Sequence, residues 1–177
     1  MKFMALRRTR FLTFSVLSLS LASTLLTGCA AGPNAATRLI TQVTDGVEGQ
    51  AGSIKLRNMT LVIQPDSSAV LVGTIVNQDE ATDAVIGIAI NGAQASIGRA
   101  GALVNELPLE LNKPVIFEGP SANAFAFLES LGAKPGYRVP VLVILANSGI
   151  VELSVLVRDR SAEFIDVARP VFTPTED

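Results

Sequence analysis

From residue 53 onward, apolar and polar residues alternate with a period of two, the pattern typical of half-buried β-strands. Ile54 and Leu56 alternate with Lys55 and Arg57, and the apolar set then shifts phase to residues 59, 61 and 63. One extra residue in the strand would cause this shift, so the sequence predicts a β-bulge near Asn58.

Similar apolar runs predict further strands over residues 70–76, 86–90, 107–111, 115–118, 125–127, 138–146 and 151–158. Residues 70–76 carry apolar side chains on both faces, which indicates a strand covered on both sides. Residues 92–105 are rich in Gly and Ala and are predicted to be a loop. Short strands at hairpin spacing, with no long amphipathic helix, favour an all-β fold, an antiparallel β-sandwich of seven to nine strands.

The first 28 residues differ from the rest of the chain. Lys2, Arg7, Arg8 and Arg10 precede an apolar stretch over residues 11–26. That stretch is shorter than the ~20 residues that a membrane-spanning helix needs. A basic segment followed by a short apolar one predicts an export signal.

The segment Leu26-Thr27-Gly28-Cys29 closes this apolar stretch and resembles the lipobox of bacterial lipoproteins. Cys29 is the only cysteine of the chain, and its thiol would carry the diacylglycerol after cleavage. Two or more acyl chains hold a protein stably on a membrane. The lipobox therefore predicts a protein tethered to the cell membrane on its extracytoplasmic face.

These patterns divide the chain into four parts. Residues 1–28 are the lipoprotein signal peptide, 29–52 a lipidated tether rich in Ala, Gly, Thr and Asn, 53–161 the sandwich, and 162–177 a C-terminal tail. We expect one helical turn in the tether around residues 37–43. The tail looks loose, although Phe164, Ile165 and Val167 offer apolar side chains for packing.

Charge argues against a nucleic-acid partner. Without residues 1–28, the chain has 10 Lys and Arg against 16 Asp and Glu, a net charge of −6. A mildly acidic chain without a basic run is not suited to bind phosphate backbones.

The sequence also argues against an enzyme. It contains no histidine, and Cys29 is committed to lipid, so triads of the Ser-His-Asp or Cys-His type are excluded. Asp79, Glu80 and Asp83 cluster in a predicted turn, but they lack the spacing of a calcium loop, and we expect them to face water.

Four segments resemble the PCu(A)C-type periplasmic copper chaperones: residues 69–85, the Leu-Pro-Leu-Glu-Leu run at 107–111, the Val-Ile-Phe-Glu-Gly run at 115–119, and residues 135–143. The whole mature chain, from Cys29 onward, is more similar to the LpqE-like lipoproteins of actinobacteria. The resemblance implies a cupredoxin-like or immunoglobulin-like sandwich.

The resemblance also implies where copper would bind. The chaperones hold Cu(I) with two His and two Met, and the second pair, a His-x-Met, would fall on Asn123 and Phe125 in this chain. Neither side chain is a soft ligand, and Met59 is the only methionine after residue 28. We therefore expect no bound metal or other cofactor.

Two hypotheses on function remain. In the first, a non-catalytic module docks on a membrane complex, such as cytochrome oxidase or another respiratory or envelope assembly. The uncharged face at Asn123, Phe125 and Phe127 would then be a partner-contact patch, although simple strand packing explains these residues too. In the second, the chain carries a small ligand or metal ion in a pocket around residues 92–105.

Overall fold

The computed structural model describes residues 46–171. Their main core is built mostly from strand residues, together with Ala95, Ala124 and Leu131 from the connections. The strands are β1 (Val47–Ala51), β2 (Ile54–Ile63), β3 (Ala69–Asn77), β4 (Asp83–Ile90), β5 (Ala93–Gln94), β6 (Ser96–Arg99), β7 (Ala102–Leu103), β8 (Leu107–Leu109), β9 (Val115–Phe117), β10 (Phe125–Leu128), β11 (Arg138–Leu145) and β12 (Gly149–Asp159). One 3₁₀ helix, η2 (Ala162–Phe164), follows them. No helix in residues 46–171 is long and apolar enough to cross a membrane.

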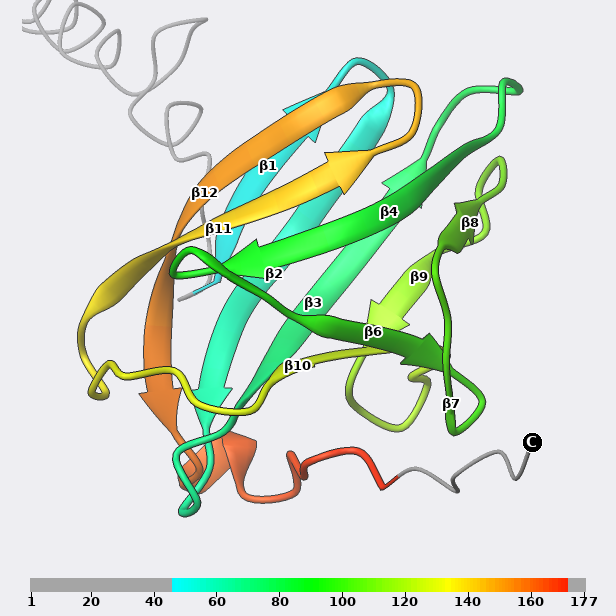
Figure 1. Ribbon diagram of the computed structural model, residues 1–177. Coiled ribbons are helices and arrows are strands. Elements are labelled where there is room, and N and C mark those ends of the chain that lie inside the picture. Colours follow the sequence, from blue (N-terminus) through cyan, green and yellow to red (C-terminus); the bar gives the residue numbers. More distant parts are fainter. Residues whose placement is uncertain (1–45, 172–177) are drawn as a thin grey trace, which may run out of the picture. The chain divides into compact units, whose positions relative to one another are not determined.

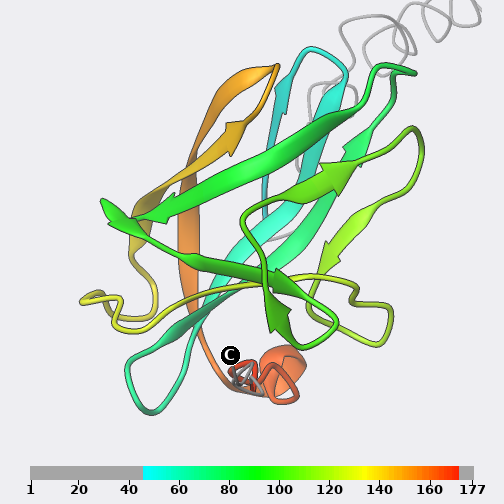
Figure 2. The same cartoon turned by 45° about the vertical axis from the view of Figure 1, so that its right-hand side comes forward.

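The strands form two layers that share β12. One layer contains β1, β2, β3, β9, β10, β6 and β7, and the other contains β5, β4, β11 and β8. The first part of β12 pairs with β11, and its last residues, from Val157 to Asp159, pair in parallel with β2. Figures 1 and 2 show β4 and β11 crossing over β2 and β3. The predicted all-β sandwich is confirmed.

The main core fills the space between these layers. It consists of apolar side chains that alternate inward along each strand, among them Leu56, Leu61, Leu71, Ile75 and Phe117. Burial of a side chain of this size stabilises the fold by about 1.5–3 kcal/mol. Since every disulfide requires two cysteines and the chain has one, packing supplies this stability.

The predicted bulge near Asn58 is confirmed. The register between β2 and β3 shifts between Arg57 and Thr60, and Asn58 has a positive φ of 54°. β11 and β12 form a hairpin, since they pair from Leu145 and Gly149 outward.

Several expectations are corrected. Residues 92–105 are not a loop: they contain β5, β6 and β7, which pair with β4, with β10 and with each other. Residues 46–171 contain twelve strands rather than seven to nine, because β1, β5, β6 and β7 lie in segments that were predicted to be tether or loop. Ile86 does not line the core but is 47 % exposed, since a register shift between Ile144 and Leu145 leaves Ile86 as an extra residue of β4.

Both predicted boundaries of the sandwich also move outward. Residues 47–51 of the expected tether form β1 and pair with β2, so the folded part begins before residue 53. Residues 162–171 of the expected loose tail pack onto the sheet through Phe164 and Val167, while Ile165 stays exposed. Figure 1 shows this segment passing the ends of β2 and β12. The helical turn expected at residues 37–43 lies outside the described residues.

Candidate functional site

Asn123 lies just before β10, and its amide joins two neighbouring segments. Its Oδ1 accepts a hydrogen bond from the backbone N–H of Ile116 at 2.9 Å, and its Nδ2 donates to the carbonyl oxygen of Pro114 at 2.9 Å. The residue is exposed, but both ends of its amide are engaged. Asn123 therefore fixes the start of β9 beside the start of β10.

Phe125 and Phe127 are buried. Their exposed fractions are 9 % and 2 %, and both belong to a second apolar cluster with Val62, Val70 and Val167. Val62 pairs with Val70, and Val70 pairs with Phe127, so these side chains form a row across β2, β3 and β10. The structure thus supports the strand-packing explanation for both rings, which are not an open patch.

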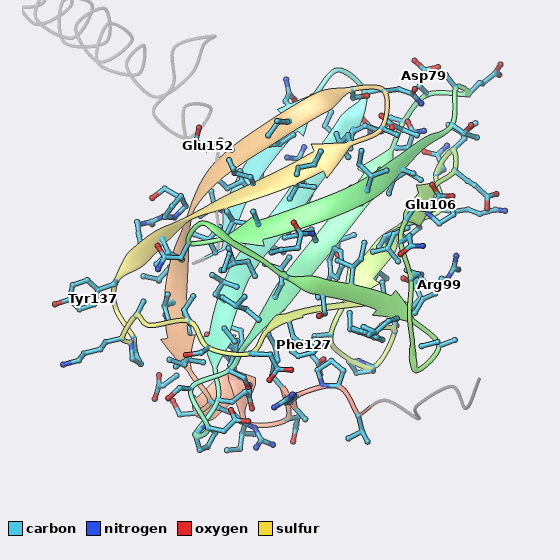
Figure 3. The ribbon with its side chains drawn as sticks, in the orientation of Figure 1. Asp79, Arg99, Glu106, Phe127, Tyr137 and Glu152 are labelled. Atoms are coloured by element: carbon cyan, nitrogen blue, oxygen red, sulfur yellow. The ribbon has the colours of Figure 1, made fainter. Side chains whose placement is uncertain are left out.

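The C-terminal segment covers this second cluster. The Arg169 guanidinium lies 5.3 Å from the centre of the Phe127 ring, and its Nη2 bonds both carboxylate oxygens of Glu129, at 2.7 and 2.8 Å. Figure 3 shows Phe127 between β10 and this segment. The interaction between a cation and an aromatic face contributes about 0.5–1 kcal/mol at an exposed site. The segment is therefore held by apolar packing and by a basic side chain.

Glu118 also binds this segment. Its carboxylate accepts a hydrogen bond from the backbone N–H of Ala168 and another from that of Gly119. Partial burial is the largest influence on this carboxyl and raises its pKa above the ordinary value, despite those hydrogen bonds and the charge of Arg160.

Two clefts adjoin one another at the ends of β6 and β10, and both are lined by Arg99, Asn123 and Ala124. The first, here the Glu110 cleft, has a volume of about 120 Å³ and is also lined by Leu107, Pro108, Glu110, Lys113, Pro114 and Val115. The second, the Glu118 cleft, is wider, at about 500 Å³, and is also lined by Ala100, Gly101, Glu118, Ala122, Phe125 and Pro170. Figure 3 shows Arg99 at the end of β6.

Glu110 and Lys113 form an ion pair at the mouth of the Glu110 cleft. The hydrogen bond from Lys113, the charge of Lys113 and, more weakly, the charge of Arg99 lower the pKa of the Glu110 carboxyl. The two clefts are therefore lined by two basic side chains, Arg99 and Lys113, and two acidic ones, Glu110 and Glu118.

Met59, the one soft side chain after residue 28, lies in the core. Its exposed fraction is 0 %, and a Cβ added at Gly73 would lie 2.6 Å from its Sδ. Its thioether is therefore packed against the β3 backbone. Residues 46–171 also contain no group of three or more acidic side chains placed to hold a metal ion.

The lipobox residues Leu26, Thr27, Gly28 and Cys29 lie outside the described residues, so lipidation stays a prediction. The clefts were not anticipated beyond a general expectation of a pocket near residues 92–105. Arg99 and Asn123 come together through the pairing of β6 with β10, in which Gly98 faces Phe125. No local pattern around either residue signals that pairing.

The sequence matches no family model and no curated relative. Its fold is similar to that of solved PCuAC domains. The copper-bound PCuAC domain from PmoF2 is 19 % identical, with a TM-score of 0.55, over 64 % of this chain and 98 % of that domain. The apo form of the PmoF2 domain gives 18 % and 0.56, over 66 % and 98 %, and the apo PCuAC domain from PmoF1 gives 18 % and 0.55, over 64 % and 99 %. The fold of this chain is therefore copper-chaperone-like, as the sequence motifs imply.

Proposed function

We propose that this chain is an LpqE-like lipoprotein: a non-catalytic binding module with a copper-chaperone-like fold that does not carry Cu(I). Its lipid anchor on Cys29 would hold it on the extracytoplasmic face of the cell membrane. There it would dock on a membrane complex, for example a respiratory assembly such as cytochrome oxidase.

The proposal rests on the side chains at positions 123 and 125, where the family's His-x-Met would fall: neither is a free, soft ligand. The Asn123 amide is engaged with the backbone of Pro114 and Ile116, and the Phe125 ring is buried. Amide and backbone oxygens are hard donors, whereas Cu(I) prefers thioether, thiolate and imidazole. The thioether of Met59, the one soft side chain after residue 28, is buried in the core beside Gly73.

A titration against a chromophoric Cu(I) chelator tests the proposal. The soluble domain, residues 44–177, should leave the chelator's spectrum unchanged at neutral pH, because it offers no pair of soft ligands. A PCuAC domain serves as the positive control. Stoichiometric removal of copper from the chelator by the soluble domain would overturn the copper-free reading.

Docking is tested separately, with the intact lipoprotein. Purification in mild detergent should co-isolate a membrane complex in a fixed ratio, and the complex should be absent when the soluble domain is used at the same concentration without the anchor. Recovery of the lipoprotein alone after cross-linking in intact membranes would contradict docking.

A second candidate function is that of a small-ligand carrier. The observation in its favour is the pair of clefts that share Arg99, one of which, at about 500 Å³, lies in the range of ligand pockets. A bound organic molecule, extracted from the natively purified domain and detected by mass spectrometry, would favour this function over docking.

A further inference from the structure

Arg99 stands apart from the other arginines of the described chain. Arg57 pairs with Glu48, Arg158 with Glu163, and Arg169 with Glu129 and Asp66. The two others donate to backbone carbonyls, Arg138 to Ser154 and Arg160 to Ile165. Within residues 46–171, Arg99 alone among the arginines has neither a hydrogen bond nor an ion pair.

The guanidinium of Arg99 lies beside two clefts. Arg99 is the last residue of β6 and lines both the Glu110 cleft and the Glu118 cleft. The Glu118 cleft is otherwise lined by two polar residues, Glu118 and Asn123, and by small or apolar ones, among them Ala122, Ala124, Phe125 and Pro170. A planar guanidinium with five donors matches the two oxygens of a carboxylate.

The other polar groups of the two clefts are already engaged. Asn123 bonds the backbone of Ile116 and Pro114, Glu110 pairs with Lys113, and Glu118 accepts from Gly119 and Ala168. Each of these contacts stays within the protein. The Arg99 guanidinium is therefore the group left to orient a ligand.

We infer that the Glu118 cleft binds a small amphipathic acid, whose oxyanion group pairs with Arg99 and whose short apolar stem lies against Ala122, Ala124, Phe125 and Pro170. A carboxylate and a monoalkyl phosphate share this chemistry. The inference names a ligand class for the carrier function and does not depend on docking or on copper.

The volume of the Glu118 cleft suits a small ligand. About 500 Å³ lies in the range of pockets that hold small organic ligands, and a stem of several carbon atoms fits within it. Each buried methylene adds about 0.8 kcal/mol to binding. The apolar stem therefore supplies most of the affinity, and Arg99 supplies the selection for negative charge.

Octanoate is a suitable probe, with the amide resonances of the ¹⁵N-labelled soluble domain, residues 44–177, as the readout. We expect saturable shifts at residues 99–101 and 122–125 at concentrations below octanoate self-association. Acetate, octanol and octylammonium should each bind at least about tenfold more weakly, because each lacks the stem or the negative charge. Octyl phosphate distinguishes the sources: a response equal to that of octanoate indicates oxyanions in general, and a much weaker one indicates carboxylates.

Variants at position 99 separate a specific site from general adsorption. Arg99→Gln should weaken octanoate binding by about tenfold or more, and Arg99→Lys should weaken it less, since it keeps the charge without the fork. Arg138→Gln is the matched control, because it removes an exposed arginine that bonds a carbonyl on β12, and it should leave the affinity unchanged. Unchanged octanoate binding by Arg99→Gln, shifts confined to other surfaces, or no saturable response to either amphiphilic anion would overturn the inference.

Discussion

The carboxylate of Asp83, at the start of β4, accepts a hydrogen bond at 2.9 Å from the backbone N–H of Asn147, 64 positions further along the chain. Its second oxygen accepts from the N–H of Ser148 at 3.0 Å, and the N–H of Ala84 donates to the first at 2.8 Å. Asp83 is only 7 % exposed. The expectation that it faces water with Asp79 and Glu80 is therefore wrong: Asp83 caps the turn between β11 and β12.

Replacing this carboxylate should destabilise the fold. Asp83→Ala leaves the N–H groups of Asn147 and Ser148 without their acceptor, and a buried unsatisfied donor costs about 1–3 kcal/mol. The free energy of unfolding, measured by urea titration at pH 7, should fall by that amount. Glu80→Gln removes one negative charge from the same connection between β3 and β4 and should leave the stability nearly unchanged. A similar loss in both variants would mean that net charge, not the cap, is responsible.

Acid should abolish the difference between Asp83→Ala and the natural chain. Burial on its own would raise the pKa of the Asp83 carboxyl, but hydrogen bonds from Ser148, Asn147 and Ala84 outweigh burial and hold the pKa below its usual value. A lowered pKa in the folded state means that the contribution is complete above the unfolded pKa of about 3.9 and is lost as pH falls through the folded pKa. Urea titrations between pH 7 and pH 2 should therefore converge at the acid end. A constant gap over this range would contradict the ionised cap.

Three places in the fold show which features can be predicted from the sequence and which cannot. The bulge at Asn58 was predictable because alternation on both sides of it fixes the phase of β2. Residues 92–105 were not, because β5, β6 and β7 have only two to four residues each, too few to show an alternation, and two of them pair with the distant strands β4 and β10. The end of the chain was only half predictable: Phe164 and Val167 are visible as apolar residues, but the row that they cover is assembled from three separate strands.

In the candidate site too, the sequence indicated positions but not the contacts made by distant segments. The spacing from the family's motif identified Asn123 and Phe125 in the sequence. It could not predict the hydrogen bonds of the Asn123 amide or the packing that buries the Phe125 ring. No pattern in the sequence around Arg99 marks it as a ligand-binding residue, since an arginine at the end of a short strand is ordinarily exposed to water. Its lack of a partner becomes visible only when the contacts of the other arginines are known.

Arg169 should hold the C-terminal segment in place without contributing much to global stability. Its ion pairs are exposed, and such pairs contribute about 0.2–1 kcal/mol each. Arg169→Ala should therefore speed hydrogen exchange at the amides of Val167 and Ala168, which bond to Phe164 and Glu118, while exchange in β2 and β11 stays unchanged. Arg57→Ala, which breaks the exposed pair with Glu48, is the matched control and should leave Val167 and Ala168 protected. Equal protection in all three proteins would show that apolar packing alone holds the segment.

Cys29→Ser should abolish lipidation in a bacterial host, because the hydroxyl does not replace the thiolate that forms the thioether. The variant should remain a precursor or leave the membrane fraction, as judged by fractionation and by intact mass. The soluble domain should still fold, since its core comes from residues 47–167. Acyl groups on the Cys29→Ser protein, detected by mass spectrometry, would show that the lipobox is misidentified.

The double variant Asn123→His with Phe125→Met should not recreate a copper chaperone, and the structure gives two reasons. First, the side chain at position 123 holds the backbone of Pro114 and Ile116, so an imidazole introduced there loses these bonds or remains engaged with them. Second, the Phe125 ring lies over Gly98, where an added Cβ would meet it at 2.0 Å, so the position points into the packed second cluster rather than toward open solvent. Only one imidazole and one thioether would be present at positions 123 and 125, half of the family's set, and we expect Cu(I) affinity well below that of a PCuAC domain in competition with a chromophoric chelator. Thermal unfolding of the same sample gives the control, because loss of the Phe125 ring should destabilise the domain by about 1–3 kcal/mol. Chaperone-like affinity in a stably folded double variant would mean that this end of the fold supplies further ligands.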